Sequence, residues 1–286
     1  MPLSTLSCLP PEVLFGLAAL LGLVVGSFLN VVIHRLPVML ERDWQAQCAA
    51  LQGKEVAADS PSYNLLTPAS TCPFCGHRIR AWENIPVLSY LFLRGRCSAC
   101  KAPISPRYPL VEILSAVLSG FVMLHFGPTL QMLAALIFVW ALLALTYIDY
   151  DTQLLPDDIT LPLLWLGLLL NWQGVFTSLP DALLGAVFGY LSLWSVYWGF
   201  KLLTGKEGMG YGDFKLLAAL GAWMGWQMLP GIILLSSIVG AIVGVTLIIL
   251  RRQDSQKPIP FGPYLAGGGL VSLFYGQQLI AWYLAR

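Results

Sequence analysis

Two aspartates lie where apolar stretches of the sequence meet polar ones. Asp149 is at the end of one stretch, in the segment YIDYD (residues 147–151), and Asp213 opens another, in the segment GYGDF (residues 210–214). Two carboxylates that share one proton can supply a general base that activates water and a general acid that protonates the leaving group. Asp149 and Asp213 are therefore a candidate catalytic pair for a hydrolytic reaction.

These acids also have structural interpretations. Asp213 could cap the helix that it opens, whereas Asp149 is harder to explain in this way, because the helix dipole disfavours an anion at a C-terminus. Asp157 and Asp158 follow a proline and precede an apolar run, which predicts a helix N-cap rather than a catalytic role. Asp151 is expected to be a solvated loop acid.

A polar segment carries two C-x-x-C pairs with 21 residues between them. The four positions are Cys72, Cys75, Cys97 and Cys100. This spacing is typical of a zinc ribbon, in which four thiolates complete a tetrahedral structural Zn²⁺ site, one per chain, with no open position for water. The alternative is a pair of disulfides, which a reducing cytoplasm disfavours. His77 could be a further ligand but is expected to be an ordinary loop histidine, and Cys8 and Cys48 are expected to be free thiols.

The elements that must position these residues are apolar. Of the 286 residues, 57% are hydrophobic and 11% are charged, against roughly 25% charged residues in soluble domains. Eight stretches approach the length of about 20 residues that crosses a bilayer, although the fourth and sixth need their flanks. They are Val13–Ile33, Leu110–Phe126, Leu130–Ile148, Leu161–Leu170, Leu183–Leu203, Leu216–Leu229, Ile232–Leu250 and Tyr264–Leu284. The predicted fold is an all-α polytopic membrane protein with about eight transmembrane helices.

The distribution of charge predicts the orientation. Nine of the 16 Lys and Arg residues lie between the first two stretches, three lie between residues 201 and 215, and three between residues 251 and 257. Because basic loops remain cytoplasmic, eight spans with an external N-terminus place all three loops on one face. Asp149 and Asp213 then share that face. The net charge of +1 gives no indication of nucleic-acid binding.

The same pattern predicts three parts. Residues 1–36 form the first transmembrane helix, which should remain as an anchor because no Lys or Arg precedes it. Residues 37–107 form a cytoplasmic zinc-binding loop, which is too polar to bury much core and therefore needs a metal staple. Residues 108–286 form a seven-helix membrane core that carries both aspartates.

Further motifs occur in a fixed order along the chain. They are GSFLNVVIHRLP (residues 26–37), NIPVLSY (84–90), RGRC (94–97) and ISPRYPLVE (104–112), together with the cysteine pairs and the aspartate motifs. This series resembles the type IV prepilin peptidase family of G-x-G-D membrane aspartic proteases. The resemblance covers nearly the whole chain and matches Asp149 and Asp213 to the catalytic positions and the four cysteines to the zinc positions.

The resemblance implies two activities in the bacterial inner membrane. One removes the short basic leader of type IV prepilins and of secretion pseudopilins, after its glycine, and the other methylates the new N-terminal amine with S-adenosylmethionine. The cysteine loop favours this bifunctional branch. No G-x-G-x-x-G turn is present, so spacing selects no S-adenosylmethionine-binding residues. Glu112 and Gly95 are candidates for binding the cofactor. The alternative for Glu112 is a snorkelling acid paired with Arg107, and the alternative for Gly95 is a tight turn before the second cysteine pair.

Two other functions compete with this interpretation. The chain could be a peptidase alone, with the zinc loop as a substrate-docking module. It could instead be a zinc-stabilised membrane scaffold or a transporter, but transporters place polar groups near the middle of the membrane, whereas these acids gather at one interface.

Overall fold

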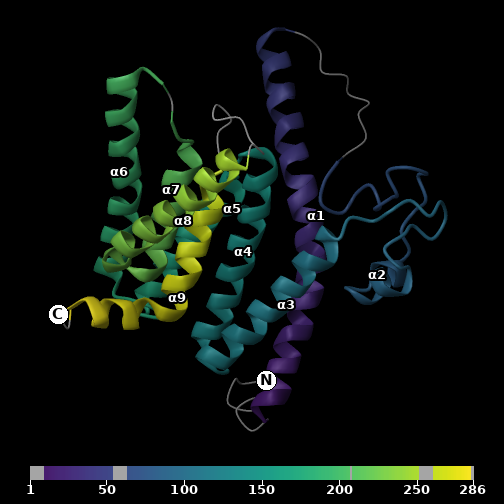
Figure 1. Ribbon diagram of the computed structural model, residues 1–286, viewed down its shortest axis with the longest axis horizontal. Helices are drawn as coiled ribbons and strands as arrows, with labels where there is room; N and C mark the ends of the chain where they lie inside the picture. The colour runs from purple at the N-terminus through teal and green to yellow at the C-terminus, as the bar shows by residue number, and fades with distance from the viewer. Residues whose placement is uncertain (1–9, 54–62, 207, 251–259, 285–286) are drawn as a thin grey trace. The chain divides into compact units, whose positions relative to one another are not determined.

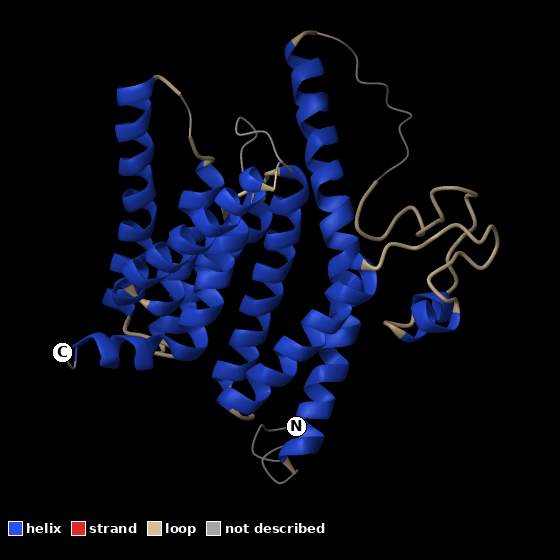
Figure 2. Ribbon diagram, in the orientation of Figure 1, coloured by secondary structure: helices blue, strands red, loops and turns tan. Residues whose placement is uncertain are grey.

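The computed structural model describes residues 10–53, 63–206, 208–250 and 260–284 (Figure 1). Within these ranges every long element is a helix and no strand is present (Figure 2). The all-α prediction is confirmed. The chain divides into two compact units, residues 1–132 and residues 133–286.

The first unit is built on two helices, α1 (Pro11–Leu51) and α3 (Arg107–Phe126), which pack side by side. Two glycines of α1 allow the close approach. A methyl group on Gly22 would lie 2.6 Å from the Ser115 carbonyl oxygen, and one on Gly26 would lie 2.7 Å from the Glu112 Cα. Small residues at such positions let helix backbones approach closely.

The polar segment between α1 and α3 holds two short helices, η2 (Ala81–Asn84) and α2 (Leu88–Phe92). Its start is fastened to α1 by Arg35, a buried residue whose guanidinium donates to the carbonyl oxygens of Asn64 and Pro68 at 2.8 and 2.6 Å. Helix α1 continues through Pro37 to Leu51, so the predicted part boundary at residue 36 lies inside a helix. The polar segment is thus bound to the flank of the helix that precedes it.

The second unit contains most of α4 and five further long helices. The bounds are α4 (Leu130–Thr152), α5 (Asp157–Trp172), α6 (Leu179–Thr204), α7 (Tyr211–Met224), η3 (Trp226–Met228), α8 (Leu229–Ile249) and α9 (Gly262–Leu284). Helix α7 is the central element, because it packs against α5, α6 and α9 and buries almost every residue after its first turn. At its C-terminal end, the Trp223 indole donates to the Leu163 carbonyl of α5 at 2.7 Å.

Seven of the eight predicted stretches lie within a single helix, apart from a residue at an end. The sixth, Leu216–Leu229, runs past the end of α7 through η3 to the first residue of α8. Five segments are long and apolar enough to cross a membrane: α1, α3, α4, α6 and the stretch Trp226–Leu247 around α8. Helices α5 and α7 have only 16 and 14 residues, as the short fourth and sixth stretches predict. The chain is therefore a helical membrane protein.

Candidate active site and metal centre

Three helix ends of the second unit converge on the two candidate acids. Asp149 lies in the last turn of α4, Asp213 in the first turn of α7, and Gly262 opens α9. The Gly262 N–H donates to Asp149 Oδ2 at 2.9 Å. Both carboxylates are buried, with 5% of Asp149 and 7% of Asp213 exposed. The two acids that the sequence separates by 64 positions therefore belong to one buried site.

The acids are near enough to interact through their charges, because the Asp149 carboxylate acts electrostatically on that of Asp213. The N-cap of α7 is Gly210, whose carbonyl oxygen accepts the Asp213 N–H at 3.3 Å. Asp213 therefore lies in the first turn of α7 and is not its N-cap residue. Repulsion between two buried carboxylates favours the form of the pair that holds one proton.

Glycines let the backbone close around this pair. A methyl group on Gly262 would lie 2.7 Å from Asp149 Oδ2, and one on Gly212 would lie 2.7 Å from Leu155 Cβ. Leu155 also contacts the Gly262 position, at 3.1 Å from such a methyl. Sequence reasoning missed Gly262 and Leu155. The signal for Gly262 was the dipeptide Gly-Pro that opens the last apolar stretch, since Pro is favoured in the first helical turn.

The neighbouring acids have a different role from the one predicted. The N-cap of α5 is Pro156 rather than Asp157 or Asp158, which lie in the first turn, so the N-cap prediction is wrong. Asp157 instead pairs with Lys215 of α7, with both carboxylate oxygens 2.7 Å from the amine. This pair is partly exposed and links the starts of α5 and α7 beside Asp213.

The four cysteines of the predicted ribbon form one cluster in the first unit, and all four are free thiols. Their sulfur atoms lie within 4.8 Å of one another, with Cys72–Cys100 at 3.8 Å and Cys75–Cys97 at 4.0 Å. Four thiolates around a tetrahedral ion with metal–sulfur bonds of about 2.3 Å would be about 3.8 Å apart. The cluster can therefore hold a metal ion.

The two knuckles repeat the same backbone turn. In the first, the Cys72 N–H donates to the His77 carbonyl and Gly76 has a φ of +71°. In the second, the Cys97 N–H donates to the Ala102 carbonyl and Lys101 has a φ of +61°. Each knuckle thus presents its two cysteines in the same way.

Backbone amides stabilise the thiolate form of one cysteine in each knuckle. The N–H groups of Phe74 and Cys75 lower the pKa of Cys72 to about 7. Those of Cys100 and Ala99 likewise lower the pKa of Cys97. Metal binding requires deprotonated thiols, so these amides favour an occupied site.

His77 lies outside the four-thiol cluster and connects the knuckles to each other. Its Nε2 is 3.2 Å from both Glu83 Oε2 and Ser98 Oγ. The Ser98 hydroxyl and the Arg80 N–H lower the pKa of Glu83 to about 2, so this carboxylate is charged at neutral pH. Cys48 is a free, exposed thiol as predicted, whereas Cys8 lies outside the described residues.

The two weak candidates for methyl transfer occupy distinct places. Glu112 is buried against α1 and accepts a hydrogen bond from the Val87 N–H at 2.7 Å, so it is not a snorkelling acid at the surface. Gly95 has a φ of +66°, and a methyl there would lie 2.9 Å from the Tyr90 hydroxyl. Gly95 therefore has the tight-turn role that was its alternative.

Together these features define a helical membrane protein with a buried pair of acids and a four-thiol cluster that can hold a metal ion. Residues 20–126 match the model of the bacterial peptidase A24 N-terminal domain, and residues 136–245 match that of the type IV leader peptidase family. The chain belongs to the type IV leader peptidase family. No solved structure matches it.

Curated relatives cover almost the whole chain. A protein of Pseudomonas aeruginosa is 63% identical over 265 residues, which are 93% of this chain and 91% of that protein. One of Aeromonas hydrophila is 60% identical over 277 residues, or 96% of each chain. One of Burkholderia pseudomallei is 52% identical over 277 residues, or 96% of this chain and 90% of that protein. All three are named prepilin leader peptidase/N-methyltransferase.

Proposed function

We propose that this chain removes the leader peptide from type IV prepilins and pseudopilins and then methylates the new N-terminal amine with S-adenosylmethionine. In this proposal the peptidase is of the aspartic type, with Asp149 and Asp213 as its catalytic residues. The main support is the convergence of three helix ends on these two buried acids. The names of the relatives support both activities.

The environment of each acid suggests how hydrolysis proceeds. One oxygen of Asp149 accepts the Gly262 N–H, which leaves its other oxygen for the attacking water. The pair holds one proton, so one carboxylate takes a proton from water while the other gives a proton to the leaving amine. After the leaving group departs, the pair again holds a single proton and is ready for another cycle.

The metal in this proposal is one Zn²⁺ bound by Cys72, Cys75, Cys97 and Cys100. Four protein ligands leave no open position, so the ion would stabilise the loop and take no part in the hydrolysis. The thiolate-stabilising amides of the knuckles support this assignment.

We place the protein in the bacterial inner membrane, with the cysteine loop and the acids on the cytoplasmic face. The support is the concentration of Lys and Arg in three loops on one predicted face. Reporter fusions after Lys206 and Lys257 should report the cytoplasm, and a fusion near Gly174 should report the outside. An external signal at Lys206 would contradict this topology and would separate the two acids across the membrane.

We also propose that the three predicted parts act as a membrane anchor (residues 1–36), a zinc-binding loop (37–107) and a peptidase core (108–286). The division of the chain between residues 132 and 133 is compatible with a core that holds both acids.

The test is to incubate the purified protein with a prepilin, with and without S-adenosylmethionine, and to weigh the N-terminal products by mass spectrometry. The Asp149→Asn and Asp213→Asn variants should each lose leader removal while still folding. Asp157→Asn is the matched control and should lose less, because Asp157 takes part in a partly exposed ion pair outside the acid site. Normal processing by Asp213→Asn would refute the catalytic assignment.

A second substrate separates the two activities. The Asp149→Asn protein should still methylate a pilin from which the leader has already been removed, because this proposal gives the two acids no role in methyl transfer. Failure of the folded, zinc-loaded variant to do so would mean that the two sites are not independent. If even the unaltered protein neither binds nor uses S-adenosylmethionine, the chain is a peptidase alone.

A further inference from the structure

Helix α2 presents an apolar face that protein does not cover within the described residues. Leu88, Leu91 and Phe92 are 52, 63 and 84% exposed, and their spacing of three and four positions places them on one side of the helix. Exposure of three large apolar side chains to water on one helical turn is unfavourable, because burial of apolar surface stabilises. A contiguous exposed apolar surface of this kind indicates a binding partner.

The start of α2 is held at the level where α3 enters the membrane. Val87, the residue before α2, donates its N–H to the Glu112 carboxylate at 2.7 Å. Glu112 is the sixth residue of α3, so at 1.5 Å per residue it lies about 7–8 Å beyond Arg107, where that helix begins. The polar interface of a bilayer has a comparable thickness on each side. With Arg107 at the membrane surface, the start of α2 is held within the depth of that interface.

The Val87 contact also fixes the position of α2. Val87 has a φ of +59°, which is rare for a β-branched residue. A buried carboxylate that accepts its N–H holds the backbone in this conformation. The packing of the first unit therefore fixes the position of the start of α2 along α3.

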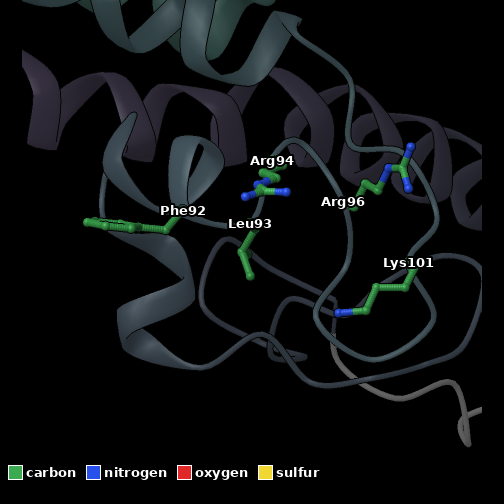
Figure 3. Close-up of a pocket in the computed structure, with 5 residues that line it drawn as sticks. All are labelled: Phe92, Leu93, Arg94, Arg96 and Lys101. Carbon is green, nitrogen blue, oxygen red and sulfur yellow. The ribbon is translucent and has the colours of Figure 1, made fainter.

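A cationic pocket of about 430 Å³ follows α2 directly (Figure 3). It is lined by Phe92, Leu93, Arg94, Arg96 and Lys101. The Lys101 amine donates to the Ser98 carbonyl at 3.2 Å, and no carboxylate in the described part of the chain pairs with Arg94 or Arg96. Three positive charges with no acidic partner call for an anionic ligand, and Phe92 is shared with the apolar face.

The turn that carries these charges is built at a conformational cost. Arg94 and Gly95 have φ values of +53° and +66°, and the Arg96 N–H donates to the Leu93 carbonyl at 3.1 Å. Positive φ at both central residues is the pattern of a type I′ turn, which favours Asn or Gly. An arginine at the first of these positions is less favourable for the backbone than Asn or Gly. The turn itself therefore does not explain the arginine, and its charge points to a ligand.

We propose that α2 and this pocket form a binding site for an anionic phospholipid of the bilayer that surrounds the protein. Leu88, Leu91 and Phe92 enter the acyl boundary, and Arg94, Arg96 and Lys101 bind the phosphate and headgroup. A basic leader peptide would be repelled by the same three cations, as would S-adenosylmethionine through its sulfonium and amine groups. The lipid site is independent of the proposed enzymatic activities.

The test uses the full-length, zinc-loaded protein in nanodiscs of phosphatidylcholine, alone or with added phosphatidylglycerol. Hydrogen exchange is measured for the amides of residues 88–96. Phosphatidylglycerol should slow their exchange, and native mass spectrometry in detergent should show that it binds more tightly than phosphatidylcholine. Each basic residue near an anionic surface is worth about 1 kcal/mol, so Arg94→Asn should weaken phosphatidylglycerol binding about fivefold.

Controls separate this site from a general attraction and from misfolding. Asn adopts the positive φ of position 94 readily, so Arg94→Asn should keep its zinc and its thermal stability. Arg78→Gln removes one charge from an exposed position elsewhere in the same loop and should leave lipid affinity unchanged. Leu91→Ser and Phe92→Ser should increase exchange in both lipids, since both remove apolar contact with the bilayer.

Three results would overturn the proposal. Equal losses of affinity in Arg78→Gln and Arg94→Asn would show diffuse attraction rather than a site. Protection of residues 88–96 that does not depend on lipid composition, or that persists in Arg94→Asn, would mean that protein covers this face. Protection that S-adenosylmethionine or a leader peptide produces, and phosphatidylglycerol does not, would assign the pocket to that ligand.

Discussion

A single methyl group at Gly262 should disturb the acid pair more than its size suggests. In Gly262→Ala the new carbon would lie 2.7 Å from Asp149 Oδ2, whereas ordinary contact begins at 3.4 Å, so the carboxylate must move by roughly 0.7 Å. Leu155 closes the other side, with Cδ2 at 3.1 Å from the same methyl. Misplacement of a catalytic group by about 1 Å can cost a factor of about 100 in rate. We expect kcat for leader removal to fall by roughly 10- to 100-fold.

The assay compares kcat and KM for a prepilin with those of Gly267→Ala, a matched change on the same helix. A methyl on Gly267 meets nothing within 4 Å, so this variant should cleave normally. Both proteins should keep their thermal stability and their methylation of a pilin without its leader. Full cleavage by Gly262→Ala would show that the position of the Asp149 carboxylate does not limit the reaction. An equal loss in Gly267→Ala would show that any added methyl on α9 disturbs the enzyme.

Two further predictions concern the metal centre and the packing behind the acids. The purified protein should hold one zinc ion by elemental analysis. The double variant Cys72→Ser, Cys97→Ser should lose the ion and unfold the loop, because one thiolate of each knuckle is removed. Full retention of zinc in this variant would refute the site. Gly185→Ala should lower the melting temperature, because its methyl would clash with the backbone of Gly221 on α7. Gly199→Ala, on the same helix as Gly185, should not lower it, because a methyl there meets nothing within 4 Å. Equal melting temperatures of the two variants would contradict this account.

Much of the architecture could be predicted because its causes are local. Each long apolar run became a helix, and the 21-residue spacing of the C-x-x-C pairs was sufficient to predict one four-thiol cluster. The two short runs lie in the two short helices α5 and α7, which have 16 and 14 residues. Asp149 and Asp213 could be paired by counting spans and basic loops, without knowledge of any contact.

Other features depend on tertiary contacts that no local pattern shows. The end of α1 at Leu51 lies well beyond the apolar stretch. The hydrogen bonds of Arg35 to the carbonyl oxygens of Asn64 and Pro68 also join residues that are about 30 positions apart. The role of Asp157 was missed because its partner, Lys215, lies 58 positions away. Gly262 was missed for the same reason, since its hydrogen bond to Asp149 spans 113 positions.

The length of α7 relates the acid site to the membrane. Its 14 residues span about 21 Å, roughly 9 Å less than the hydrocarbon core, so one end must lie below the surface. The C-terminal end is followed by Trp226, whose indole donates to Asp181 at 3.0 Å, an arrangement typical of the membrane interface. With Trp226 at the outer interface, we infer that the end of α7 that carries Asp213 is the recessed one.

A recessed acid pair needs access to water. The partly exposed ion pair between Lys215 and Asp157 lies one turn or less from Asp213, and charged side chains at such a depth require hydration. Water that solvates this pair can also reach the acids and supply the hydrolytic nucleophile. A substrate must then bring its scissile bond below the surface. A bond at the head of a transmembrane helix meets this condition, because the apolar helix that follows it carries the bond to that depth, and this is where a prepilin leader ends in the proposed function.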